Sequence, residues 1–163
     1  FVWQDMTTPA IHTSYGDMKG FPTRLLVSSD GEPTSQIAPK EVLAIENWAL
    51  FSYNLHKATF RGLDRLPSRS GKRNFILGRG SFSGAHRYAG LWTGDNASTW
   101  DFWRITVSQV LSVGLNGVSI AGSDMGGFEP AVGADGQEEK YCSPELLIRW
   151  YSGSVLLPWL RNH

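Results

Sequence analysis

Two aspartates of this 163-residue sequence stand where strand-like runs give way to loops. Asp5 follows the apolar run Phe1-Val2-Trp3, and Asp95 follows Tyr88-Ala89-Gly90-Leu91-Trp92. Both runs suit buried strands, and Pro9 prevents the first from continuing as a central strand. An acid at the end of a strand is where α/β barrels place reactive groups. Asp5 alone could equally cap a turn or a helix, so the hypothesis depends on the pair.

A pair of carboxylates is the usual equipment for cleaving a glycosidic bond. One attacks the anomeric carbon and the other protonates the leaving oxygen, if the two lie about 5–5.5 Å apart. Candidate stacking surfaces for sugar rings are Trp3, Trp92 and Phe128, and candidate hydroxyl ligands are Arg79, Asp124 and His163. Structural alternatives stay open: Arg79 and Asp124 could pair with each other, the tryptophans could be core, and His163 could end a strand.

The elements that must position these residues alternate along the chain. We expect strands at 1–3, 74–77, 88–92, 118–121 and 156–160, and helices at about 39–63, from Ser98 or Thr99 to about 114–117, and at 143–154. The alternation favours parallel strands with helical crossovers. In a (β/α)₈ barrel the residues that end such strands converge on one face. A doubly wound sheet gives the same alternation, so spacing alone leaves both folds open.

Apolar residues at helical spacing predict the buried face of the second helix. They are Trp100, Trp103, Val107, Val110 and Leu111. The stretch from about 9 to 39 is rich in Gly, Pro, Ser, Thr and Asp and predicts a loop insertion, with a short extended piece at 25–27. Five strands cannot close a barrel, so residues 1–163 are expected to be a fragment of one barrel domain.

The composition narrows the classes of function. Fifteen basic and fifteen acidic residues give a formal net charge of zero, which argues against nucleic acid or an anionic membrane as a partner. No apolar run approaches the roughly 18–20 residues that span a bilayer. The spacing of His and Cys matches no zinc site, and the glycines at 78–84 match neither a dinucleotide fingerprint nor a phosphate loop. We therefore expect no metal and no cofactor.

Four sequence blocks and one arginine together resemble the successive motifs of glycoside hydrolase family 31. They are Trp3-Gln4-Asp5-Met6, Arg79, Trp92-Thr93-Gly94-Asp95-Asn96, Gly122-Ser123-Asp124-Met125-Gly126-Gly127-Phe128 and Arg161-Asn162-His163. The resemblance implies strands four to eight of a (β/α)₈ catalytic barrel, with Asp5 as nucleophile and Asp95 as general acid. It also implies that a subsite for the non-reducing-end glucose is lined by Trp3, Met6, Arg79, Trp92, Asp124, Phe128 and His163.

Two departures from the family's α-glucosidases stand beside these motifs. Thr7-Thr8-Pro9 replaces their usual Asn-Glu-Pro, and Gly80 replaces the Ser that usually follows the arginine. Both changes resemble the α-1,4-glucan lyases, particularly the fungal ones, and make Thr7 and Thr8 the expected determinants of elimination over hydrolysis. The resemblance implies release of 1,5-anhydro-D-fructose from starch, glycogen or malto-oligosaccharides, with Asp5 acting as nucleophile and then as base. A retaining α-glucosidase or transglucosylase, or a non-catalytic glucan-binding relative, remain the alternatives.

Overall fold

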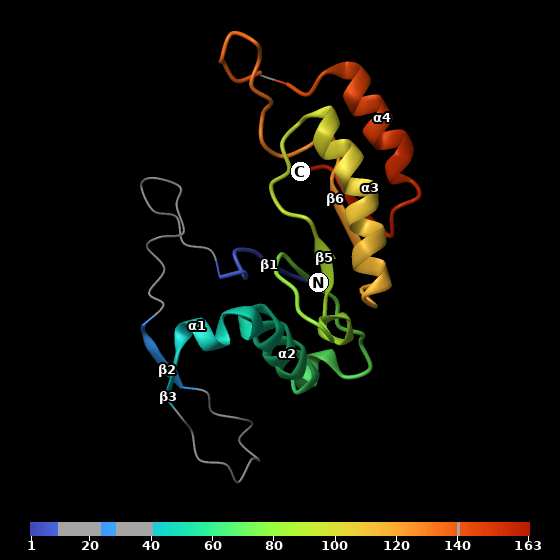
Figure 1. The fold of residues 1–163 in the computed structure, drawn as a ribbon. Coiled ribbons are helices and arrows are strands. Elements are labelled where there is room, and N and C mark those ends of the chain that lie inside the picture. The colour runs from blue at the N-terminus through green and yellow to red at the C-terminus, as the bar shows by residue number, and fades with distance from the viewer. Residues whose placement is uncertain (10–23, 29–40, 140) are drawn as a thin grey trace.

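A five-stranded parallel sheet forms the centre of the chain in the computed structural model, which describes residues 1–9, 24–28, 41–139 and 141–163 (Figure 1). Its strands are Val2–Gln4 (β1), Ile76–Gly78 (β4), Gly90–Trp92 (β5), Ala121–Asp124 (β6) and Trp159–Arg161 (β7). They lie side by side in chain order, β1-β4-β5-β6-β7. A doubly wound sheet reverses its strand order at a switch point, whereas a barrel wall does not. The strand order therefore selects the barrel wall, which spacing alone had left open.

Several strands begin later than the apolar runs suggested. The fourth strand of the sheet is Ala121–Asp124 rather than 118–121, and the fifth is Trp159–Arg161 rather than 156–160. Ladder pairing decides strand bounds, whereas apolar character only marks burial: Val118 is buried in the core but precedes the ladder. The shift places the polar residues of both motifs inside or directly after the strands.

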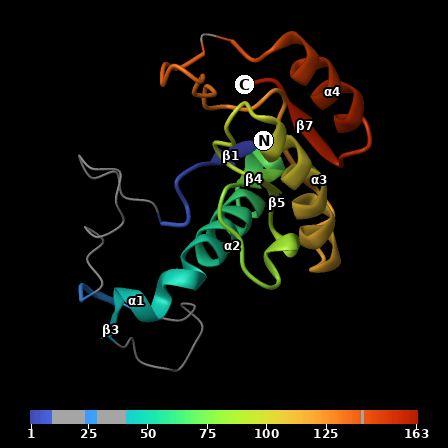
Figure 2. The same cartoon turned by 45° about the horizontal axis from the view of Figure 1, so that its top comes forward.

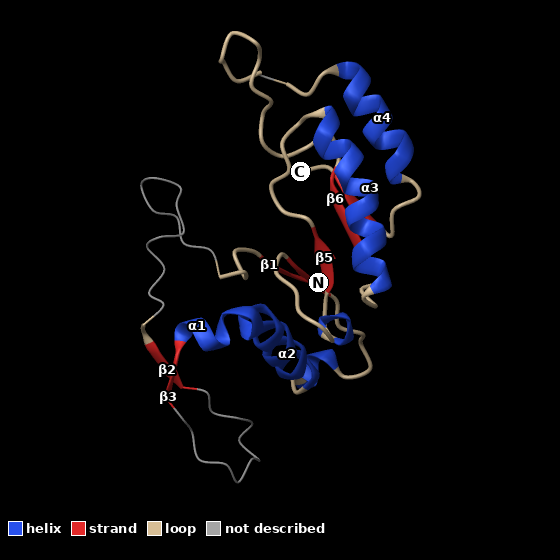
Figure 3. Cartoon of the chain, viewed as in Figure 1, coloured by secondary structure: helices blue, strands red, loops and turns tan. Residues whose placement is uncertain are grey.

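The predicted helix at 39–63 is wrong at its start. Glu41–Leu43 is a strand (β3) that pairs antiparallel with Leu26–Ser28 (β2), the extended piece expected near 25–27. Helical structure then runs through Ala44–Asn47 (α1), a 3₁₀ turn at Trp48–Leu50, and Phe51–Asp64 (α2). Figure 3 shows the two short strands at the far end of α1, away from the main sheet. Residues 10–23 and 29–39 of the predicted 9–39 insertion, Pro39 included, lie outside the described residues.

The two later helices start where their capping residues predict. Thr99 accepts a hydrogen bond from the amide of Phe102 at 3.3 Å, and Trp100–Leu115 forms α3. Ser143 accepts from the amide of Leu146 at 3.4 Å, and Pro144–Ser154 forms α4. The two helices lie side by side in Figures 1 and 2. Within the described residues, no helix has both the length and the apolar character required to cross a bilayer.

The predicted buried face of α3 is only partly right, because Trp103 and Val110 pack inward but the other three residues do not. The buried residues of α3 are Thr106 and Val110, whereas Val107 and Leu111 are exposed, as is Trp100. One apolar cluster joins Val110 to Val118 and Ala121 and holds α3 on the sheet.

A second cluster packs α4 against α3 and β6. Its buried members are Met125, Leu146 and Trp150, with Trp103 of α3 packed against them. The indole N–H of Trp150 donates to the Ser123 hydroxyl at 3.2 Å. These contacts join α4 to α3 and to β6.

Candidate active site

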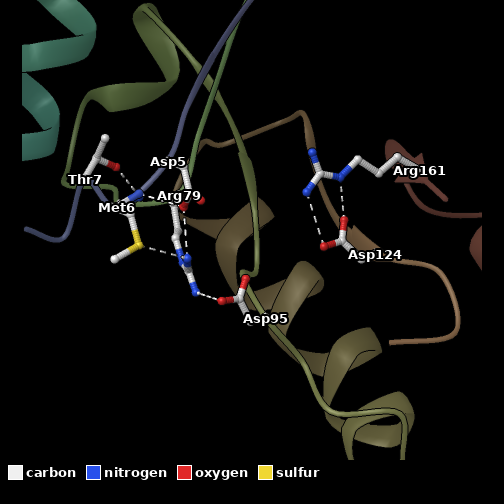
Figure 4. A network of polar contacts seen from close by, with 8 residues as sticks. Asp5, Met6, Thr7, Arg79, Asp95, Asp124 and Arg161 are labelled. Atoms are coloured by element: carbon white, nitrogen blue, oxygen red, sulfur yellow. Dashed lines mark hydrogen bonds and ion pairs between the residues drawn. The ribbon is translucent and has the colours of Figure 1, made fainter. Parts of the chain in front are cut away.

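The Arg79 guanidinium lies between the two candidate catalytic acids (Figure 4). Its Nη1 is 2.9 Å from Oδ1 of Asp5, and its Nη2 is 2.7 Å from Oδ2 of Asp95. The three residues come from the ends of three adjacent strands, β1, β4 and β5. Asp5 and Asp95, 90 positions apart in the sequence, thus contact the same guanidinium group, as the barrel hypothesis requires.

Both acids remain accessible to solvent. The side chains of Asp5 and Asp95 are 35% and 31% exposed, and that of Arg79 is 20% exposed. Partial burial lowers the pKa of Arg79, but the hydrogen bonds and charges of Asp5 and Asp95 raise it by more, so the net pKa lies above its ordinary value. The guanidinium is therefore a permanent cation in contact with both acids.

Strand geometry directs Asp5 toward the site. Side chains alternate along a strand, so Trp3 and Asp5 share one face of β1 while Gln4 points to the other. Directly after Asp5, Met6 adopts a left-handed backbone with φ of 59°, unusual for a residue other than glycine. Its amide donates to Oδ1 of Asp5 at 2.6 Å, and its sulfur lies 3.5 Å from Nη1 of Arg79. The sharp turn at Met6 ends the strand and fixes the carboxylate.

Three of the predicted sugar-binding residues form one aromatic row. The ring centroids of Trp3 and His163 lie 5.9 Å apart, and those of His163 and Phe128 are stacked at 4.8 Å. Trp3 is 42% exposed and Phe128 is 46% exposed, and His163 is also exposed. Flat aromatic faces open to solvent are suited to stacking on apolar sugar faces. The row begins at Trp3, on the same side of β1 as Asp5.

Two other predicted substrate ligands are buried instead. Trp92 is fully buried beneath Trp3, with their centroids 5.5 Å apart, so its ring offers no open surface. The Asp124 side chain is 1% exposed, and both its oxygens accept hydrogen bonds from Arg161, at 2.6 and 3.3 Å. The pairing of Arg79 with Asp124, an alternative from sequence, is therefore wrong; each has another partner.

Thr7 and Gly80, two positions where the sequence departs from the family's α-glucosidases, are in direct contact. Thr7 is 2% exposed, and its hydroxyl accepts a hydrogen bond from the Gly80 amide at 2.8 Å. Thr8 is exposed. Of the two threonines after Asp5, only Thr7 is therefore part of the packed site.

The whole chain, residues 1–163, matches the family profile described as the glycosyl hydrolases family 31 TIM-barrel domain. The chain belongs to glycoside hydrolase family 31. Its described residues are an α/β fragment with a parallel sheet, part of the family's TIM barrel. Among those residues, no group of three or more His, Cys, Asp or Glu is arranged to hold a metal ion.

Sequence relatives within family 31 include α-glucosidases. The chain is 32% identical over 162 residues to "Alpha-glucosidase 2" of Bacillus thermoamyloliquefaciens, covering 99% of this chain and 18% of that protein. It is 31% identical over 171 residues to "Glucosidase 2 subunit alpha" of Saccharomyces cerevisiae, covering 100% of this chain and 15% of that protein. The chain thus spans less than a fifth of the length of each.

Among solved structures, the chain superimposes on a covalent intermediate complex of the Gracilariopsis lemaneiformis α-1,4-glucan lyase with a TM-score of 0.77. The identity is 23%, covering 99% of this chain and 18% of that one, so the likeness concerns the fold. A glucosidase II catalytic subunit in its heterodimeric complex gives a TM-score of 0.70 at 27% identity, covering 100% of this chain and 15% of that one. The lyase and the glucosidase share the same barrel wall.

Sequence reasoning missed Arg161 as a member of this family 31 site. Arg161 belongs to the quoted motif Arg161-Asn162-His163, but the resemblance carried no role for it. Its guanidinium lies 4.9 Å from the Trp3 ring centroid and 5.2 Å from that of Trp92. Arg161 therefore connects the buried Asp124 carboxylate to the aromatic row through cation–π contacts. The sequence signal that could have revealed it is that Arg161 is a second arginine at a strand end, and that Asp124, at the end of the preceding strand, needs a basic partner.

We expect Arg161→Gln to destabilise the barrel strongly. The substitution leaves the Asp124 carboxylate, which solvent cannot reach, without its counter-charge, and breaking a buried pair in this way costs about 3–5 kcal/mol. A lowered midpoint of thermal unfolding of the intact protein checks this. Arg149→Gln is the matched control, because the Arg149–Glu145 pair is 63% and 72% exposed and should contribute at most ~1 kcal/mol. Equal shifts in the two variants would contradict the expectation.

Proposed function

We propose that the protein cleaves α-glucosidic bonds at the non-reducing end of glucans by a double-displacement mechanism. The observation that carries this proposal is the Asp5–Arg79–Asp95 arrangement, in which two solvent-accessible acids, from the strand ends on either side of β4, share one guanidinium. Such a pair can flank a single bond, with one acid on each side of it. Family membership and the α-glucosidases among the sequence relatives support an α-glucoside as the substrate.

In the first half of the proposed reaction, Asp5 acts as nucleophile and Asp95 as general acid. An Asp5 oxygen attacks C1 of the terminal glucose while Asp95 gives its proton to the glycosidic oxygen, so the C1–O bond breaks and a glucosyl ester forms on Asp5. The Met6 amide, 2.6 Å from Oδ1 of Asp5, orients that carboxylate for attack. Arg79 fixes the position of both acids and binds a sugar hydroxyl with the donors left free.

The aromatic row is the proposed platform for the sugar. Trp3, His163 and Phe128 offer exposed rings beside Asp5, as stacking on a pyranose requires. Trp92 and Asp124 support this platform from below through Trp3 and Arg161. We therefore assign them to positioning rather than to direct sugar contact. Starch, glycogen and malto-oligosaccharides are the substrates that we propose on this basis.

Hydrolysis is the outcome of the second half that the comparisons support better. The sequence relatives above 30% identity described here are glucosidases by name, whereas the likeness to the lyase lies in the fold. In this version Asp95 removes a proton from water, the water oxygen attacks C1, and the bond between C1 and Asp5 breaks, so glucose leaves with its α configuration retained and the Asp5 carboxylate is restored. The first proposal is thus a retaining α-glucosidase rather than the lyase that the departures at 7, 8 and 80 suggested.

One observation favours elimination, and it keeps an α-1,4-glucan lyase as the second candidate. The two departures are in contact, because the Thr7 hydroxyl accepts a hydrogen bond from the Gly80 amide. A serine at position 80 would also meet the Ser52 side chain and the backbone carbonyl of residue 7, so it would not fit without a shift. In elimination, the Asp5 oxygen that leaves C1 takes the proton from C2, and the resulting enol tautomerises to 1,5-anhydro-D-fructose.

Product analysis of the intact protein tests both candidates. We expect incubation with maltose or soluble starch to release a monosaccharide from the non-reducing end. A hydrolase yields α-glucose first, and a lyase yields a product lighter than glucose by one water, which mass spectrometry and proton NMR distinguish. An inactive protein that still retains glucan on affinity electrophoresis would overturn the enzymatic proposal and indicate a non-catalytic binding relative. The accessible acid pair argues against that result.

A further inference from the structure

A buried histidine links the two strand ends that carry Asp5 and Arg79. His56 lies in α2, is 1% exposed, and takes no part in the chemistry proposed above. Its Nδ1 lies 2.5 Å from the side-chain oxygen position of Gln4, and its Nε2 lies 3.0 Å from the Gly80 carbonyl oxygen. Gln4 directly precedes Asp5, and Gly80 directly follows Arg79. The imidazole therefore connects the immediate neighbours of the two site residues.

The room for this ring comes from a glycine in the neighbouring strand. A β-carbon at Gly78 would overlap the His56 imidazole. Gln4 pairs with Gly78 in the last register position of β1 and β4, so the ring lies where the ladder between the strands ends. Beyond it, the Arg79 amide still donates to the Gln4 carbonyl at 3.1 Å. Beyond the ladder, His56 links the end of β1 to the segment that follows β4.

The peptide that follows Arg79 is held on both of its polar groups. The Gly80 amide donates to the Thr7 hydroxyl at 2.8 Å, and the Gly80 carbonyl faces His56. A β-carbon at Gly80 would lie 2.7 Å from the Ser52 hydroxyl oxygen and 2.9 Å from the Thr7 carbonyl oxygen. The loop after Asp5 and helix α2 thus enclose Gly80, which leaves the backbone beside Arg79 little freedom to move.

The hydrogen bonds around His56 have one consistent direction. The Gly80 carbonyl can only accept, so in the neutral ring Nε2 of His56 carries the proton and Nδ1 accepts. In the structure the Gln4 side-chain nitrogen faces the Thr59 hydroxyl at 2.6 Å and its oxygen faces Nδ1. A neutral ring with its proton on Nε2 requires these two amide atoms to exchange places, so that the NH₂ group donates to Nδ1 and the oxygen accepts from Thr59. Burial lowers the pKa of His56 more than the Gly80 hydrogen bond raises it, which agrees with a neutral ring.

We propose that His56 is a positioning residue that holds Asp5 and Arg79 at their reactive separation through Gln4 and Gly80. The inference rests on the proposed function, because it assumes that Asp5 is the nucleophile. Displacement of a reacting group by about 1 Å can cost roughly 10²-fold in rate. The aromatic row lies on the opposite side of β1 from Gln4, so loss of His56 should slow the chemical step while sugar binding is largely kept.

His56→Phe in the intact protein tests the inference, because it keeps an aromatic ring and removes both hydrogen bonds. We expect kcat for an aryl α-glucoside to fall by about 10- to 100-fold, with KM within about threefold of the wild-type value. Covalent labelling of Asp5 by 5-fluoroglucosyl fluoride, followed by intact mass, should slow in parallel. His56→Gln, whose amide can still donate toward the Gly80 carbonyl, should recover most of the loss.

A variant of matched stability separates positioning from folding. Val110→Ala removes buried methyl groups from the α3 cluster, away from His56, and should lower the unfolding midpoint without lowering kcat. A kcat for His56→Phe within twofold of wild type, or an equal loss in Val110→Ala, would overturn the inference. Should His56→Phe not fold, Thr59→Val removes the far end of the chain of hydrogen bonds, and we expect it to lower kcat about threefold or more, with unchanged kcat again overturning the inference.

The proposed function can be refuted independently of the role of His56. Turnover by Asp5→Asn would refute the nucleophile and, with it, the proposed function. An inactive Asp5→Asn beside a fully active His56→Phe would refute only the role of His56.

Discussion

Asp5→Asn should abolish turnover of α-glucosides by the intact protein. The amide that replaces the carboxylate is a far weaker nucleophile, so no glucosyl ester forms, and loss of a catalytic nucleophile typically lowers kcat by about 10⁴- to 10⁶-fold. The loss should be the same for hydrolysis and for elimination, because both share the first half of the reaction. The measurement is release of product from maltose, together with intact mass after incubation with 5-fluoroglucosyl fluoride, which should label the wild type alone.

A second aspartate provides the control for removal of charge. Asp101 lies at the start of α3, its side chain is 81% exposed, and its contact with Arg104 is a surface ion pair at 3.3 Å. Asp101→Asn should therefore leave kcat unchanged. The unfolding midpoint of Asp5→Asn should also stay near that of the wild type, because Arg79 keeps its contact with Asp95. Residual turnover above 1% in Asp5→Asn would remove Asp5 from the nucleophile's role.

Asp95→Asn should give a loss that depends on the leaving group. Cleavage of maltose needs a proton at the glycosidic oxygen, so kcat/KM for maltose should fall by about 10²- to 10⁴-fold. A dinitrophenyl α-glucoside has a leaving group that departs without protonation, so its first half-reaction should be slowed far less. Equal losses for the two substrates would show that Asp95 supports folding or binding rather than proton transfer.

The same variant distinguishes hydrolysis from elimination. In a hydrolase, Asp95 must also activate water, so Asp95→Asn should accumulate the glucosyl ester from the dinitrophenyl substrate and show a burst of dinitrophenolate. In a lyase, Asp5 itself removes the C2 proton and Asp95 is not needed again, so no burst should follow. Rapid-mixing absorbance measurements give the answer without a separate product assay.

Local patterns predicted most of the elements and the position of two aspartates at strand ends. Thr99 and Ser143 begin helices because a capping side chain acts on an amide three residues away, a short-range effect that sequence displays directly. The start of the predicted 39–63 helix was wrong because Glu41–Leu43 pairs with Leu26–Ser28, and tertiary pairing overrides the local helical pattern. The buried face of α3 was partly wrong because apolar spacing does not say where the sheet lies.

The surroundings of individual side chains at the site were less predictable from sequence. From sequence, Trp92 and Asp124 were expected at the sugar; in the structure one is covered by Trp3 and the other is closed off by Arg161. Nothing in the sequence distinguished His56 from the other residues of its helix. Only its position against Gly78 and Gly80, on a helix packed against β4, gives it a role.

The sequence by itself determined the alternation of strands and helices, the two aspartates at strand ends, and the family to which those motifs belong. Each depends on residue type and on spacing along the chain. The tertiary structure alone decided that Arg79 bridges Asp5 and Asp95 and that Thr7 meets Gly80. Those contacts depend on strand order and register, which bring together residues separated by tens of positions, and on the alternation of side chains that sends Asp5 inward and Gln4 toward α2.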